Sequence, residues 1–172
     1  MRMLDLLERV AIALAWIAMA EMAALILAMC WEVTARYGFN APTLWSIDVS
    51  LMLNGTMYLL AAGYALREDA HVRIDVLSRR LPPAAQHLVA ALVLLLLFLP
   101  CIGWLGYTGA VKAADAYARG ERELSSAWGP LVWPVYAGMA LGLLGLALQS
   151  LVRGLRHLAA LRDPAASPLP RA

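Results

Sequence analysis

Acidic side chains inside otherwise apolar stretches are the residues of this sequence with the clearest capacity for chemistry. Glu21 is the only acidic or basic residue between positions 10 and 31, and Asp48 is the only one between positions 37 and 66. A carboxylate at the depth of Glu21 in a membrane span could carry a proton or a cation, or it could stay protonated or hydrogen-bond a neighbouring helix. No second acidic residue or lysine lies mid-span to complete a relay, which favours the structural interpretation.

A second group of charged residues lies around the end of the first apolar stretch. Glu32 precedes Arg36 by one helical turn, in the favourable acid-before-base order. If the chain turns at Pro42, Arg36 and Asp48 lie at the same depth on neighbouring helices, because each is six residues from the turn. We therefore predict a Glu32–Arg36–Asp48 cluster that joins the first two helices or fastens them to a partner. The alternative is that the three side chains are solvated separately.

The positions of the histidines and cysteines do not favour a catalytic or cofactor-binding site. His71, His87 and His157 all fall near one predicted membrane boundary, whereas a transmembrane haem needs axial histidines that face each other inside the bundle. An interfacial haem between His71 and His87 is the one alternative. Two cysteines are too few for a zinc cluster, and no catalytic triad or phosphate-binding glycine loop is present. We expect no enzyme, no cofactor and no metal.

The overall composition explains why charged side chains are so sparse. The chain has 172 residues, of which 62% are hydrophobic and 15% are charged, and its mean hydropathy is +0.68. Soluble domains carry about 25% charged residues. The net charge of +2 is too small to indicate a nucleic-acid partner. The sequence therefore predicts an integral membrane protein whose surroundings are a lipid bilayer.

The apolar stretches divide into four candidate spans. A helix needs about 20 residues to cross the ~30 Å hydrocarbon core, and each charge-poor window holds one helix of that length. We predict an all-α protein with transmembrane helices near 10–31, 45–66, 85–107 and 130–152. These helices form a single membrane domain over residues 1–160, and residues 161–172, rich in proline and alanine, are predicted to be a disordered cytoplasmic tail.

The distribution of basic residues predicts the orientation of the four spans. Ten of the 14 Lys and Arg residues fall on the side that holds both termini and the middle connection. Basic residues are retained on the cytoplasmic side. We therefore expect both termini to be cytoplasmic.

The middle and last connections differ in character. Residues 67–81 mix charges with apolar side chains and are predicted to lie on the membrane surface as an amphipathic segment. Pro82 and Pro83 suit a helix start, and Gly120 suits a helix stop. The third helix is therefore expected to run to residue 119, well beyond the length needed for one crossing.

Polar and small residues within the spans indicate contacts between helices. Asn54 and Thr56 are typical of interhelical hydrogen bonding rather than of ligand binding. Gly138 and Gly142 form a small-residue face on the fourth span, which allows close approach of another backbone. That backbone could belong to the same chain or to another subunit, and both possibilities stay open here.

Several segments along the chain match one known family. They are Trp31–Tyr37, Trp45–Ser50, Gly63–Arg67, His71–Leu77 followed by Leu81 and Pro82, Gly120–Pro130, and Trp133–Tyr136. Over roughly residues 5–155 the chain resembles the small membrane subunit (DctQ type) of tripartite ATP-independent periplasmic (TRAP) transporters. The resemblance implies structural or interface roles for Trp45, His71 and Asp75. One departure is Asp48, where the family often carries glutamate.

What the resemblance implies is a heteromeric symporter of the bacterial inner membrane. A large membrane subunit would hold the sodium and substrate sites, and a periplasmic binding protein would deliver an organic acid. The present chain would be a scaffold for uptake, in agreement with its lack of a relay. The main alternative is a stand-alone proton-coupled multidrug exporter that uses Glu21, and a second is a membrane anchor for a respiratory enzyme.

Overall fold

The computed structural model describes residues 2–68 and 82–162, and within these ranges the chain is helical with short connections. Four helices are long and apolar enough to cross a membrane, spanning Leu7–Gly38, Ser46–Arg67, Ala84–Arg119 and Trp133–Leu161. This confirms the prediction of an all-α protein with four transmembrane helices. Each predicted span overlaps one of these helices.

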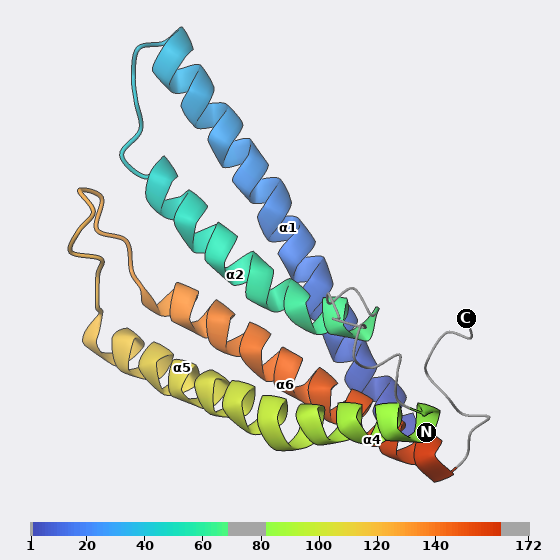
Figure 1. Ribbon diagram of the computed structural model, residues 1–172. Helices are drawn as coiled ribbons and strands as arrows, with labels where there is room; N and C mark the ends of the chain where they lie inside the picture. Colours follow the sequence, from blue (N-terminus) through green and yellow to red (C-terminus); the bar gives the residue numbers. More distant parts are fainter. Residues whose placement is uncertain (1, 69–81, 163–172) are drawn as a thin grey trace.

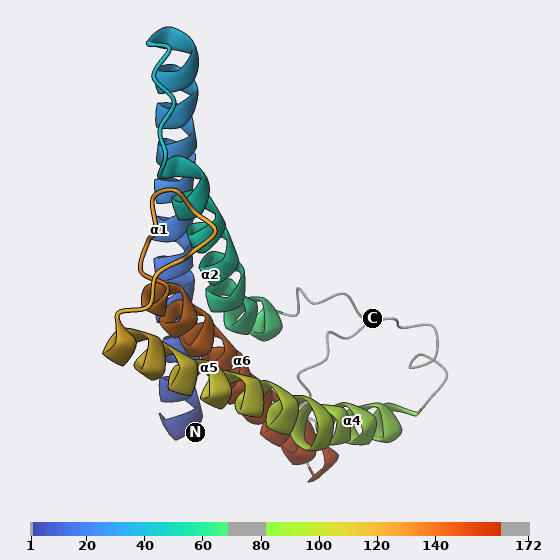
Figure 2. The same cartoon turned by 90° about the vertical axis from the view of Figure 1, so that its left-hand side faces the viewer.

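The helices are arranged as an open fan rather than as a closed bundle (Figures 1 and 2). The elements are α1 (Arg2–Gly38), α2 (Ser46–Arg67), α4 (Pro83–Leu92), α5 (Leu99–Arg119) and α6 (Trp133–Arg162). Side by side, the order is α1, α2, α6 and then α5. Figure 2 shows α1 standing across the direction of the α4–α5 helix. The two outer members therefore expose long faces that no helix in the described part of the chain covers.

Helix α6 is the centre of the fan. It packs against α2 on one side and against α4 and α5 on the other, and it also reaches α1. In its most apolar window 44% of the residues are buried, compared with 6% in the third transmembrane helix. α6 therefore supplies most of the packing inside the chain.

Small residues allow this close packing of α6. A Cβ built on Gly142 would lie 2.5 Å from the backbone carbon of Leu59 in α2. A Cβ built on Gly138 would lie 2.7 Å from a methyl group of Thr56. The glycine face of the fourth span is therefore an internal contact with α2, which decides between the two partners that its sequence left open.

The third transmembrane helix is continuous from α4 to α5 through a π-helical turn over Val93–Phe98. In this turn the N–H of Leu99 bonds the carbonyl of Leu94, five residues back. The wider turn lies directly before Pro100, whose ring would collide with the carbonyl of Leu96 in a regular α-helix. The chain thus accommodates the proline without ending the helix. Gly120, with a φ of 61°, then ends α5 in the left-handed conformation.

Two predicted segments lie outside the described residues. They are the amphipathic surface segment over residues 67–81, apart from Arg67 and Glu68, and the tail over residues 161–172, apart from Leu161 and Arg162, which belong to α6. His71 and Asp75 belong to the first of these and are likewise not described.

Candidate functional site

The described polar side chains gather in three places, one at each end of the helices and one in the middle. At the end where α1 begins and α6 ends, Glu8 of α1 pairs with Arg156 of α6 at 2.5 Å and approaches Arg67 of α2 at 3.8 Å. Nearby, the buried side chain of Arg153 donates to the carbonyl of Leu66. That carbonyl is in the last turn of α2, where a cation also stabilises the helix dipole. These contacts join residues that are far apart in the chain, so no local pattern in the sequence indicates them.

Two buried histidines lie at the same end. His87 of α4 and His157 of α6 are 5% and 1% exposed, and their Nδ1 atoms are 3.0 Å apart. One ring must donate the shared proton while the other accepts it. The pair therefore joins the third and fourth transmembrane helices. We call Glu8, Arg67, His87, Arg153, Arg156 and His157 the terminal cluster.

Halfway along α1, Glu21 reaches across to α2. The hydroxyl of Thr56 lies 2.9 Å from Oε2 of Glu21 and 2.9 Å from the carbonyl of Met52. A hydroxyl has one proton and two lone pairs, so Thr56 can donate to a carboxylate, or accept from a protonated Glu21 while donating to Met52. Thr56 therefore gives the Glu21 side chain a hydrogen-bonding partner within the chain.

This geometry predicts how Glu21 responds to substitution. Glu21→Gln should leave the thermal unfolding midpoint in detergent nearly unchanged, because the amide can donate to or accept from Thr56. Glu21→Leu should lose the interhelical bond, which is worth about 0.6 kcal/mol and at most about 1.7 kcal/mol between membrane helices. Thr56→Val serves as the partner control and should lower the midpoint to a similar extent. A Glu21→Gln variant as unstable as Glu21→Leu would contradict a hydrogen-bonding role.

At the other end of the helices, Glu32 is the acceptor that holds the connection between α1 and α2. Its side chain is 8% exposed and pairs with Arg36. It also accepts the backbone N–H of Thr43 at 3.0 Å and the hydroxyl of the same residue. The linker that follows Gly38 therefore runs back along the last turns of α1, as Figure 1 shows.

The predicted contact between Arg36 and Asp48 is wrong. The chain leaves the helix at Gly38 and turns near Asn40, whose φ is 50°, so Pro42 is not the midpoint of the turn. The extended linker brings Thr43, rather than Asp48, to the depth of Glu32. In the described part of the chain, Arg36 pairs with Glu32 alone.

Asp48 instead joins α2 to the connection between α5 and α6. It accepts a hydrogen bond from the hydroxyl of Ser126, and the same hydroxyl accepts the backbone N–H of Trp128 at 3.1 Å. Further along this loop, Glu123 and Pro130 are joined by a backbone hydrogen bond of 2.9 Å. The loop over residues 120–132 is thus ordered by its own bonds and tied to α2.

The stability of this loop is expected to depend on pH through Glu123. The hydroxyl of Ser125 donates to its carboxylate at 2.6 Å, and this bond lowers the pKa of Glu123. Because the folded pKa lies below the unfolded one, the bond supports the loop at neutral pH. This support is lost as the pH falls through the lowered pKa.

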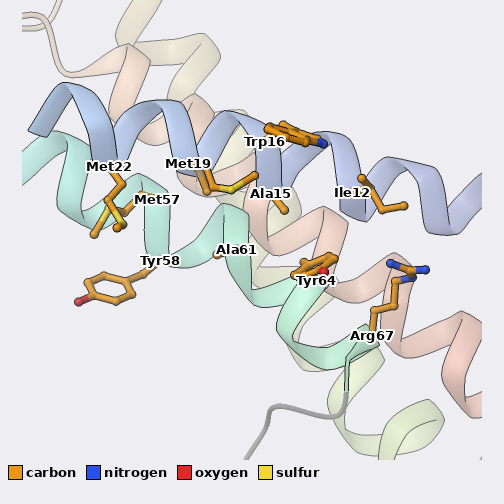
Figure 3. A pocket seen from close by; sticks show the side chains of 11 residues that line it. Ile12, Ala15, Trp16, Met19, Met22, Met57, Tyr58, Ala61, Tyr64 and Arg67 are labelled. Atoms are coloured by element: carbon orange, nitrogen blue, oxygen red, sulfur yellow. The ribbon is translucent and has the colours of Figure 1, made fainter.

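A groove of about 550 Å³ runs between α1 and α2. Figure 3 shows its walls, where Met22 of α1 lies next to Met57 of α2, the ring of Tyr58 points away from α1, and Arg67 lies at one end. Most of the lining is apolar and flexible, which suits an apolar occupant. Among the residues that the structure describes, no three His, Cys, Asp or Glu side chains gather closely enough to hold a metal ion.

The remaining predicted site residues are also placed by these contacts. Trp45 is half-buried and directly precedes α2, while Gly138 and Gly142 lie inside the α2–α6 contact. Together, the polar contacts and the glycine contact hold the helices and their connecting loops in position.

Comparison with known proteins identifies the family. A family model described as tripartite ATP-independent periplasmic transporters, DctQ component, matches residues 25–160. This chain belongs to that family. The DctQ component described here is thus a TRAP transporter small permease subunit and a multi-pass protein of the bacterial inner membrane. This assignment takes the place of the multidrug exporter and the respiratory anchor.

One curated relative of this DctQ component has a more specific description. The sialic acid TRAP transporter small permease protein SiaQ of Vibrio cholerae serotype O1 (strain ATCC 39315 / El Tor Inaba N16961) is 34% identical over 95 residues. The match covers 54% of this chain and 55% of that protein. The matched region thus spans about half the length of this relative.

Proposed function

We propose that this small permease subunit is a static scaffold for the large membrane subunit of a TRAP transporter. One observation carries the proposal: the carboxylates within its described spans bond to neighbours in the same chain, as Glu21 does to Thr56 and Glu32 to Thr43. A carrier needs groups that bind the ion differently in two states. Such groups, and the sodium site, then belong to the large subunit.

The substrate proposed for the complete transporter is an organic acid. The name of the relative from Vibrio cholerae specifies sialic acid, which carries a carboxylate. For the transporter that contains this chain we propose a carboxylate substrate, and we do not propose sialic acid itself.

The proposed orientation places the terminal cluster in the cytoplasm and the Asp48–Ser126 contact in the periplasm. It follows from the excess of basic residues on the side of the termini. The loop over residues 120–132 then faces the periplasm with Leu124 96% exposed. Trp128 and Leu131 of the same loop are also exposed, and an ordered loop with several exposed apolar side chains suits the docking of a periplasmic binding protein.

Reconstitution tests the scaffold function directly. The small subunit alone, the large subunit alone and both together are placed in liposomes with an inward sodium gradient, each with the substrate-loaded binding protein outside. Uptake is expected only when both membrane subunits are present. Uptake by the small subunit alone, above that of empty liposomes, would overturn the proposal.

A further inference from the structure

Asn54 is a polar side chain on the outside of a membrane helix. It is exposed on α2, and within the described part of the chain its amide group forms no hydrogen bond. Thr56, two residues later, bonds to Glu21 of α1. Of Asn54 and Thr56, only Thr56 therefore forms an interhelical hydrogen bond within the part of the chain that the structure describes.

At the depth of Asn54 in the membrane, an exposed amide without a hydrogen bond is energetically unfavourable. Asn54 lies eight residues from the start of α2 at Ser46 and 13 residues from its end at Arg67. At 1.5 Å per residue these separations are about 12 Å and about 20 Å, so the amide lies inside a hydrocarbon core of ~30 Å. An unsatisfied amide there costs several kcal/mol. A lipid headgroup would not reach that depth.

The residues around Asn54 form a surface suited to another helix. Leu51 and Tyr58 are 67% and 66% exposed and lie one turn to either side of Asn54. Between them is Gly55, where an added Cβ would meet nothing within 4 Å. An amide next to a glycine on an exposed helix face allows close approach and a hydrogen bond together. We call Leu51, Asn54, Gly55 and Tyr58 the Asn54 patch.

The Asn54 patch continues into the α1–α2 groove. Tyr58 belongs to both, and Met57, one turn from Asn54, faces Met22 across the groove (Figure 3). The groove and the Asn54 patch together form a mostly apolar surface along α1 and α2, and Asn54 lies just beyond one end of the groove. A single membrane helix that lies along this surface would contact both.

We propose that a transmembrane helix of the large permease subunit lies along the α1–α2 groove and supplies a hydrogen-bonding group to Asn54. This inference rests on the proposed scaffold function and names the face that the function uses. A second copy of this chain fits less well, because a two-fold axis at Asn54 would set groove against groove and leave both unfilled.

Matched glycine substitutions test the location of the contact. Gly55→Leu and Gly103→Leu each add a side chain to an exposed transmembrane helix, and neither added Cβ meets an atom within 4 Å. Both variants should therefore keep the melting temperature of the isolated small subunit. Gly55→Leu is expected to weaken co-purification of the large subunit by tenfold or more, whereas Gly103→Leu should not change it. The opposite pattern would place the large subunit on the third helix and overturn the inference.

Substitution and crosslinking at position 54 test the hydrogen bond and the identity of the partner. Asn54→Leu should weaken the complex by about three- to seventeen-fold, and Asn54→Gln should restore part of that loss. A photo-reactive residue at position 54 in the assembled transporter should crosslink to the large subunit. Crosslinks to lipid alone or to a second copy would contradict the inference. A second photo-reactive residue replaces Leu97, which is exposed on the third helix. Crosslinks of the large subunit to position 97 instead of position 54 would keep the scaffold function but show that the proposed face is wrong. If the two subunits never co-purify, the scaffold function itself fails.

Discussion

Gly142→Ala is expected to separate α2 from α6 and to cause a large loss of stability. The new methyl group would lie 2.5 Å from the backbone carbon and 2.7 Å from the carbonyl oxygen of Leu59. Neither atom can move without its helix, so the two helices must shift apart. Overpacking of this kind costs about 1–3 kcal/mol and occasionally more. The thermal unfolding midpoint of the purified chain in detergent measures the loss.

Gly103→Ala is the matched control for this experiment. It makes the same chemical change in a transmembrane helix, but the added Cβ meets nothing within 4 Å. Its stability should be unchanged or slightly raised, because alanine loses less conformational entropy than glycine in a helix. Equal losses in the two variants would mean that the close approach of α2 and α6 does not stabilise the chain.

Glu32→Ala is expected to release the connection between α1 and α2. The substitution removes the acceptor for two hydrogen bonds from Thr43 and the partner of Arg36. Hydrogen bonds to a charged group are worth about 1.5–3 kcal/mol, and losing part of a buried cluster leaves its partners unsatisfied. We expect a loss of about 2–4 kcal/mol, together with faster proteolysis of the linker near Thr43.

Arg36→Ala should cost much less than Glu32→Ala. Its side chain is 43% exposed, and an exposed ion pair contributes about 0–1 kcal/mol. A double-mutant cycle should give clear coupling between Glu32 and Thr43, and additive effects for Arg36 and Asp48. Coupling between Arg36 and Asp48 instead would show that the linker takes a different path.

The number and kind of helices could be predicted because they depend on local properties of the sequence. Charge-poor windows of the length needed to cross a bilayer are counted directly, and Pro83 and Gly120 mark the ends of the third helix by their own backbone chemistry. The role of Thr56 followed from its residue type at membrane depth. None of these conclusions requires knowing which helix is beside which.

The contacts between distant residues could not be predicted in the same way. The pairing of His87 with His157 joins residues 70 positions apart, and that of Asp48 with Ser126 joins residues 78 positions apart. These pairings depend on the position of α6 between α2 and α5, which no periodicity encodes. The prediction for Arg36 and Asp48 fails for a similar reason, because it requires a turn that is symmetric about Pro42, whereas the chain turns near Asn40.

The central place of α6 also determines the order in which the protein is assembled during translation. The ribosome makes α6 after the other three transmembrane helices, yet the α4–α5 helix has its main contacts with α6. α1 and α2 can pack against each other once both are inserted. The third helix, in contrast, has its packing partner within the described chain only after α6 is inserted. A nascent chain that stops before α6 is therefore left as a helical hairpin and a lone helix. Insertion of α6 is therefore the step that joins the α1–α2 hairpin to the third helix.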